Sequence, residues 1–170
     1  MKEILERTSV RSFSDKLIDK LIVEKLLKSA MAAPSAMNSQ PWEFIVIDKR
    51  EILNDLATKL PYASMAKQAP LGIIVVGNMK RALSGINQDY WIQDCAAATE
   101  NMLIAVEELG LGAVWTGICP GKDKMKVISD KFSLPEHIKP FNLVLIGYPA
   151  SKPRIKDKYK EEYIHINNWK

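Results

Sequence analysis

Three stretches of the chain carry side chains that could bind a flat ligand with an anionic tail. In the first, Arg7-Thr8-Ser9-Val10-Arg11, two guanidinium groups and a hydroxyl stand at alternate positions. Alternate side chains of an extended segment point to one side, so Arg7, Ser9 and Arg11 could converge on a phosphate, whose oxygens suit the planar donors of arginine. The alternative is a surface loop with exposed arginines, and these residues alone favour that alternative.

The second stretch, residues 33–42, is bracketed by Pro34 and Pro41, which favour a fixed loop shape. The hydroxyl of Ser35 and the side-chain amides of Asn38 and Gln40 could hydrogen-bond a heterocycle with alternating donors and acceptors. A turn between a helix and a strand is the alternative interpretation. Such a turn would need the prolines but not the amides.

The third stretch, Lys152-Pro153-Arg154, lies in a C-terminal region where lysines alternate with acidic residues. A solvated surface is expected for this region, apart from Lys152 and Arg154. The formal net charge of +4 is too small to indicate nucleic-acid binding. No apolar run is long enough to cross a bilayer, and the charged N-terminus lacks a signal-peptide core, so we expect a cytoplasmic protein.

One long helix, expected over residues 89–109, must position these stretches. Asp89 is its expected N-cap, Gly110 is expected to end it, and apolar residues recur along it at helical spacing. Its other face also offers few polar positions, which places the helix deep in the domain or in an oligomer interface. Cys95 on this helix, and Cys119 beyond it, are expected to be small core residues rather than nucleophiles.

The remaining elements follow from the apolar patterns of a chain expected to be one domain over residues 1–170. The predicted strands cover residues 43–48, 71–77, 112–120 and 141–148, and the further helices cover residues 19–32, 48–60 and 122–132. Asp19 is an expected N-cap, and Asp48 with Glu51 forms an expected capping box. Strands separated by helices indicate mixed α/β topology with a largely covered sheet.

Two further features indicate contacts with other molecules. Gly117 could let a ligand or another backbone approach the third strand, or it could mark a bulge. Apolar residues such as Tyr163, Ile166 and Trp169 stand in an otherwise polar tail. Residues 150–170 are therefore expected to form a terminal strand or arm on another surface, such as a second subunit.

Most kinds of catalysis lack the residues they need. His137 and His165, the two histidines, have no metal-ligand or nucleophile companion nearby, and no glycine loop of a dinucleotide-binding or phosphate-binding motif is present. We therefore expect neither a metal site nor a catalytic side chain. A reaction carried by a bound cofactor is the more attractive hypothesis.

Taken together, the three stretches occur in the order and spacing of the nitroreductase family, which binds FMN, and the chain resembles that family. The resemblance extends to Trp115-x-Gly117, to the segment 147–149 and to the tail that carries Trp169, so it covers nearly the whole chain. It implies an α+β fold with a mixed central β-sheet flanked by helices. It also implies an intertwined homodimer with two FMN sites at the subunit interface and with residues 150–170 on the partner.

The resemblance further implies which residues bind FMN. Some match the family's phosphate grip, some match a loop that reaches the flavin from the neighbouring subunit, and some match a turn whose backbone lies against the ring. The implied set is Arg7, Thr8, Ser9, Arg11, Pro34, Ser35, Ala36, Asn38, Gln40, Trp115, Thr116, Gly117, Lys152 and Arg154.

The activity implied by the resemblance is that of an FMN-dependent oxidoreductase. NADH or NADPH donates a hydride to FMN and leaves, and an electron-poor acceptor such as a nitroaromatic or a quinone takes its place in a ping-pong mechanism. The alternative is a flavin-binding module that sequesters or senses FMN without turnover. The short segment 78–88 favours this alternative, because longer family members carry extra helices there that shape acceptor access.

Overall fold

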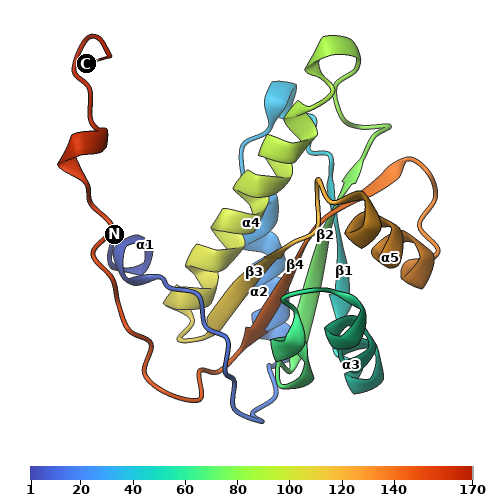
Figure 1. The fold of residues 1–170 in the computed structure, drawn as a ribbon, viewed down its shortest axis with the longest axis vertical. Coiled ribbons are helices and arrows are strands. Elements are labelled where there is room, and N and C mark those ends of the chain that lie inside the picture. Colours follow the sequence, from blue (N-terminus) through green and yellow to red (C-terminus); the bar gives the residue numbers. More distant parts are fainter. Residues whose placement is uncertain (170) are drawn as a thin grey trace.

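A four-stranded antiparallel sheet lies at the centre of the computed structural model, which describes residues 1–169 (Figure 1). Its strands are β1 (Trp42–Ile47), β2 (Leu71–Asn78), β3 (Gly112–Gly117) and β4 (Ile138–Gly147), in the order β1-β2-β4-β3. The central strands β2 and β4 are largely apolar and buried, as expected of strands covered on both faces. The four predicted strands are confirmed, but the expected mixture of strand directions is not, because every neighbouring pair is antiparallel.

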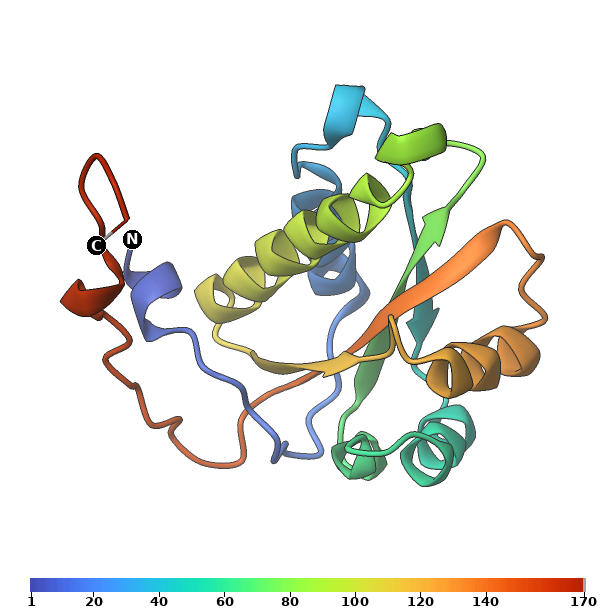
Figure 2. The same ribbon diagram turned by 45° about the horizontal axis from the view of Figure 1, so that its top comes forward.

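Helices cover both faces of this sheet (Figure 2). On one face pack α2 (Lys20–Met31) and α4 (Tyr90–Glu108), and on the other pack α3 (Arg50–Lys59) and α5 (Lys122–Phe132). The sheet therefore separates two layers of buried apolar side chains. The predicted α+β fold is confirmed.

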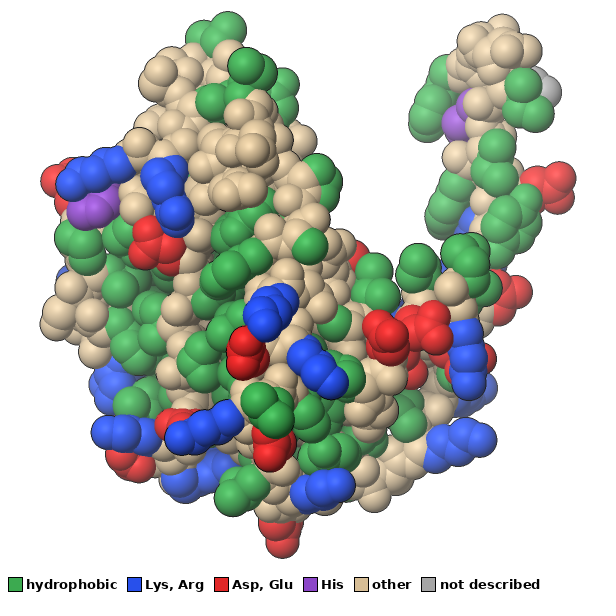
Figure 3. Space-filling view, turned by 180° about the vertical axis from the view of Figure 1, so that it is seen from behind, with side chains coloured by type: hydrophobic (Ala, Val, Ile, Leu, Met, Phe, Trp, Pro, Cys, Tyr) green, Lys and Arg blue, Asp and Glu red, His purple; other side chains and the backbone are tan. Residues whose placement is uncertain are grey.

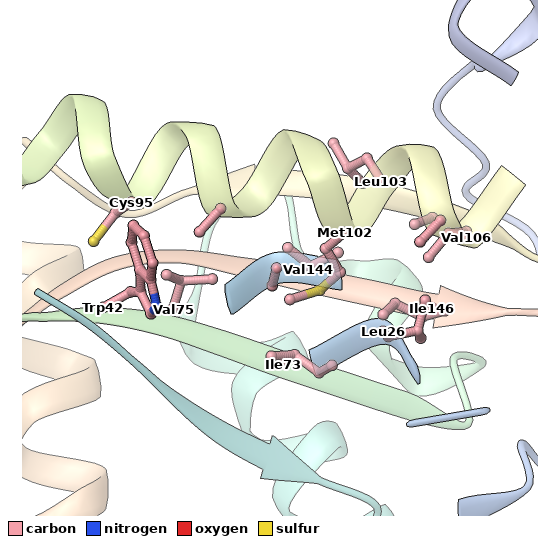
Figure 4. Packing of buried hydrophobic residues seen from close by; sticks show 14 of the residues in the cluster. Leu26, Trp42, Ile73, Val75, Cys95, Met102, Leu103, Val106, Val144 and Ile146 are labelled. Atoms are coloured by element: carbon pink, nitrogen blue, oxygen red, sulfur yellow. The ribbon is translucent and has the colours of Figure 1, made fainter. Parts of the chain in front are cut away.

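The long helix α4 is the main cover of its face of the sheet. Cys95, Met102 and Val106 point from α4 into the core beneath it (Figure 4). Gly110, with a left-handed φ of 69°, follows the end of the helix as predicted. Asp89 occupies the N-cap position, although its side chain makes no capping hydrogen bond.

The other two predicted capping residues had different outcomes. Asp19 caps α2 as predicted, because its Oδ1 accepts the N–H of Leu21 at 2.7 Å. The predicted capping box of Asp48 and Glu51 is wrong. The helix α3 begins after Lys49, and no side chain caps its start.

Short helical segments fill several of the connections. They are α1 (Lys2–Glu6), which the sequence analysis did not predict, and the 3-10 turns η1 (Ala36–Asn38), η2 (Ser64–Lys67), η3 (Gly85–Asn87) and η4 (Glu161–Tyr163). Across residues 1–169, none of the helices combines the length and the apolar character that crossing a bilayer requires.

The C-terminal segment leaves the sheet and projects beside the N-terminus (Figures 1 and 2). Within its described residues, 150–169, it forms no strand, and Tyr163, Ile166 and Trp169 are 76%, 71% and 85% exposed. Figure 3 shows hydrophobic side chains along this projecting segment. Exposed apolar surface of this kind is typical of a contact with another molecule. Packing of the segment on a partner stays a prediction, and Lys170 lies outside the described residues.

Candidate functional site

The N-terminal segment that carries Arg7, Ser9 and Arg11 is extended and is held by β3 and by the chain that follows β4. Val10 donates its N–H to the carbonyl of Ala113 on β3 at 2.9 Å. Two more backbone hydrogen bonds join the segment to the chain that follows β4: Ser14 N–H to Tyr148 O at 2.9 Å, and Ala150 N–H to Ser12 O at 3.1 Å. The segment is thus fixed between the start of β3 and the end of β4.

Two glycines make this close approach possible. A Cβ on Gly112 would lie 2.6 Å from a methyl carbon of Val10, and a Cβ on Gly147 would lie 2.8 Å from the ring of Phe13. Both distances are far inside van der Waals contact. Because Val10 and Phe13 are buried against these glycines, their packing decides where Arg11, which lies between them in sequence, is presented.

The extended segment and the chain after β4 enclose a hollow of about 630 Å³. Its lining residues come from two stretches far apart in the sequence: Arg7, Thr8, Ser9, Val10, Arg11, Ser12, Ser151, Lys152, Pro153, Arg154, Lys156 and Lys158. The structure therefore brings the first and third stretches of the sequence analysis together in one place, which we call the cationic hollow.

The charged side chains that line the cationic hollow all have one sign. Six of its lining side chains are cationic and none is acidic: Arg7, Arg11, Lys152, Arg154, Lys156 and Lys158. Hydroxyl groups, including that of Ser9, stand among them. A phosphate monoester carries a charge of about −1.5 to −2 at pH 7 and offers three acceptor oxygens, so this donor set fits such a group.

Arg7 is held through both its side chain and its backbone. Its Nε lies 3.3 Å from Oε1 of Glu100 on α4, and its carbonyl accepts a hydrogen bond from Lys158 Nζ at 2.6 Å. Lys156 and Lys158 were expected only as part of a solvated surface. Their place at the hollow depends on how the tail folds back, which the local sequence pattern does not show.

A second hollow, of about 430 Å³, shares Ser12 with the cationic hollow. Arg50 and Lys67 also line it, and the Arg50 guanidinium donates to the carbonyls of Ala66, Lys67 and Ala69 at 2.9, 2.9 and 2.8 Å. Arg50 therefore fixes the turn η2 beside the site. Arg50 was not predicted as part of the site, because its partners lie beyond the helix that it begins.

The proline-bracketed loop has a backbone that few residues adopt. Met37, Asn38 and Gln40 have left-handed φ angles of 51°, 55° and 45°. The loop is braced from within, because Ser35 Oγ accepts the N–H of Gln40 at 3.0 Å and Gln40 Nε2 donates to Asn38 Oδ1 at 3.1 Å. Ser35 and Gln40 therefore hold the loop shape, whatever else they bind.

The turn η1 of this loop and the backbone segments that carry the lining residues of the cationic hollow lie toward opposite ends of α4 (Figures 1 and 2). The turn η1 lies beside the start of α4, whereas the segments that form the hollow pass the other end of that helix. The described residues that line the hollow include none of the candidate loop residues, which are Pro34, Ser35, Ala36, Asn38 and Gln40. A single copy of the chain does not combine the two groups.

The strand β3 carries the third group of candidates, Trp115, Thr116 and Gly117. The ring of Trp115 packs edge-on against Phe141 with centroids 5.4 Å apart, so this partly buried side chain lies against the core. Thr116 is buried. A Cβ on Gly117 would meet no atom of the described chain within 4 Å, and the Gly117 carbonyl accepts a hydrogen bond from Lys124 Nζ at 2.8 Å. The pairing of β3 with β4 is regular, so an open approach for a ligand is favoured over a bulge.

The two thiols are poor candidates for chemistry. Burial raises the pKa of Cys95 to about 12, and burial also raises the pKa of Cys119. Neither thiol therefore forms the reactive thiolate readily. Among residues 1–169, no three side chains of the His, Cys, Asp and Glu types gather where they could hold a metal ion.

Comparison with known proteins identifies the class to which this fold and site belong. Residues 4–61 and 54–148 match the nitroreductase family, and the chain belongs to that family.

Among its relatives is the "Putative NADH dehydrogenase/NAD(P)H nitroreductase" of Methanothermobacter thermautotrophicus, 40% identical over 169 residues that cover 99% of this chain and 87% of the relative. A crystal structure of a protein with the same name from Bacteroides thetaiotaomicron matches with a TM-score of 0.93 and 42% identity, over 99% of this chain and 96% of that one. An FMN-dependent nitroreductase from Clostridium difficile matches with a TM-score of 0.90 and 27% identity, over 99% of this chain and 100% of that one.

Proposed function

We infer that this protein is an FMN-dependent NAD(P)H oxidoreductase and that the cationic hollow binds the phosphate of FMN. The observation that carries this inference is the convergence of Arg7, Ser9, Arg11, Lys152 and Arg154 on one hollow. Family membership and the FMN-dependent relative support the choice of FMN among phosphate-bearing ligands.

The donor set of the cationic hollow supports retention of a mononucleotide. Hydrogen bonds between charged groups contribute about 1.5–3 kcal/mol each, more than neutral ones. Several such bonds to one phosphate would offset the entropy lost when the ligand is held. Thr8 and Ser9 add neutral donors that fix the orientation of the phosphate.

We propose that two copies of the chain complete each site. The loop residues Pro34, Ser35, Ala36, Asn38 and Gln40 of one copy would contact the ring of the FMN whose phosphate is held by the other copy. The separation of loop and hollow at opposite ends of α4 supports this arrangement, and so does the exposed apolar surface of the C-terminal segment. The same segment, with Tyr163 and Trp169, would then pack on the partner.

Bound FMN would supply the redox chemistry, namely hydride transfer from NADH or NADPH to an electron-poor acceptor such as a nitroaromatic or a quinone. The chain itself binds the FMN and orients it. The open face at Gly117 leaves room for a ring beside the backbone of β3, and Lys124 fixes the carbonyl of Gly117 from behind. A ping-pong order follows if donor and acceptor use the same open face in turn.

Stopped-flow mixing of the FMN-loaded protein with NADH and with NADPH tests the activity. Rapid loss of the flavin absorbance, followed by its return when a quinone or a nitroaromatic is added, is the expected result. Flavin that stays oxidised with both donors would instead support a module that sequesters or senses FMN. If the rate at which NADH or NADPH reduces the flavin depends on the concentration of the acceptor, the ping-pong order is contradicted.

A further inference from the structure

Asp94, on the first turns of α4, is a buried carboxylate with only one of its two oxygens hydrogen-bonded. The side chain is 5% exposed, and its Oδ1 accepts the N–H of Ala36 at 2.8 Å. Its Oδ2 is buried and has no hydrogen-bond partner among the described residues. A buried carboxylate in this state is costly, and such groups persist where something other than stability requires them.

The partner of Asp94 is the loop with the left-handed backbone. Residues in that region of φ and ψ cost about 1–3 kcal/mol each and persist only where surrounding contacts hold them. Within the described chain, the bond from Ala36 to Asp94 is the one hydrogen bond that joins residues 34–40 to a different element. The remaining bonds, such as that of Gln40 to Ser35, are internal to the loop.

We propose that Asp94 is a positioning residue, which fixes the loop of residues 34–40 in the shape that meets the flavin ring. The carboxyl acts through Ala36 and does not itself touch the ring. This inference rests on the proposed function, because it assigns a role to the loop that the FMN site requires. In this role the oxygen Oδ1 positions the loop by accepting the N–H of Ala36, and the negative charge of the carboxylate is not required.

Thr99 provides a matched comparison within the same helix. It is also a buried polar residue of α4, and its Oγ1 donates to Cys95 O at 2.7 Å and accepts from Asn142 Nδ2 at 2.9 Å. These bonds tie the helix to itself and to the sheet, and none of them reaches the loop. A substitution at Thr99 therefore perturbs the core of α4 without releasing residues 34–40.

The test compares D94N, D94L and T99V in the full-length protein. FMN affinity is measured by titration, and the visible absorption and circular dichroism of the bound flavin are recorded at saturating FMN. D94L removes the acceptor, so we expect an affinity loss of about tenfold or more and an altered spectrum of the bound ring. D94N keeps an acceptor oxygen and is expected to stay within about threefold of the parent with an unchanged spectrum. T99V is expected to lower the melting temperature but to leave the flavin spectrum as it is.

A second variant approaches the same hydrogen bond from the loop. Ala36 is the first residue of η1, a position that suits proline, and Ser35 before it has the extended backbone that proline requires. A36P removes the N–H donor without touching the core, so it remains informative if D94L fails to fold. We expect A36P to reproduce the spectral change, and D94L to add little in the A36P background.

Three results would overturn the role of Asp94: wild-type FMN affinity and spectrum in D94L, damage in D94N equal to that in D94L, or full additivity of D94L and A36P. Each of these would leave the proposed function intact as long as the parent protein binds FMN. A parent protein that binds no FMN would overturn the proposed function, and this inference with it.

Discussion

At the scale of single residues, the cationic hollow shows how side chains that are unremarkable in sequence become a site. Arg7 and Arg11 could equally have been exposed arginines on a surface loop. They differ from ordinary surface arginines because the chain after β4 brings Lys152 and Arg154 to the same hollow. Motif order and spacing could predict this meeting, but the places of Lys158 and Glu100 beside Arg7 could not be predicted, since neither lies in a motif.

Replacement of Arg11 with alanine should weaken FMN binding by about tenfold to a hundredfold, because it removes a charge-assisted donor from the hollow. Fluorescence titration measures the affinity, and the far-ultraviolet spectrum should not change. K160A is the matched control, since it removes a positive charge from the tail at a residue that does not line the hollow. Equal FMN affinity in R11A and the parent protein would remove Arg11 from the site.

Asp94 should make stability depend on pH. Burial raises its pKa above the ordinary value, so the folded state holds a proton that the unfolded chain releases from about pH 3.9 upward. Stability is therefore lost as pH rises from that point through the folded-state pKa, and the loss is complete above it. The asparagine of D94N does not titrate, so D94N does not lose stability in this way. We therefore expect the melting temperature of D94N to rise relative to that of the parent protein as pH is raised from 4 to 8. A constant difference across this range would contradict the prediction.

At the scale of elements, the pattern of apolar residues predicts which segments are helices and which are strands, but not the strand directions or every helix cap. The four strands, the helix capped by Asp19 and the end of α4 at Gly110 all follow from local rules. The directions of the strands do not, since they depend on which strand each connection returns beside. The false capping box at Asp48 has a similar cause, because the start of α3 is set at Lys49 without a side-chain cap.

The two glycines that bound β3 should respond differently to an added methyl group. In G112A the new Cβ would press into Val10 at 2.6 Å, so we expect a stability loss of about 1–3 kcal/mol and displacement of the N-terminal segment. In G117A the Cβ would meet nothing within 4 Å, so the melting temperature without FMN should not change. If the flavin ring lies against Gly117, FMN affinity should nevertheless fall. Thermal melts with and without FMN measure both effects, and an equal stability loss in the two variants would contradict the packing described.

At the scale of the whole molecule, two features of the chain support the proposed assembly of two copies. The loop of residues 34–40 and the cationic hollow lie at opposite ends of α4, and the C-terminal segment exposes large apolar side chains such as Trp169. Both features fit an assembly of two copies. The tail's apolar residues can be noticed in sequence, but the sequence pattern does not indicate which surface they would contact.

Deletion of residues 163–170 should shift the protein toward monomer, because it removes the exposed apolar side chains of Tyr163, Ile164, Ile166 and Trp169. Sedimentation velocity over a range of protein concentrations measures the change. K160A serves again as a control, since it alters the tail without removing apolar area. An undiminished dimer in the truncated protein would refute a role for this segment in assembly.

The most direct test of the central claim is the visible absorption spectrum of the protein after incubation with FMN and removal of free ligand. A cationic hollow that holds the FMN phosphate predicts a yellow protein that retains a stoichiometric amount of flavin, and it predicts loss of that flavin in R11A. A protein that is colourless when purified, and remains colourless after the incubation, would contradict the account.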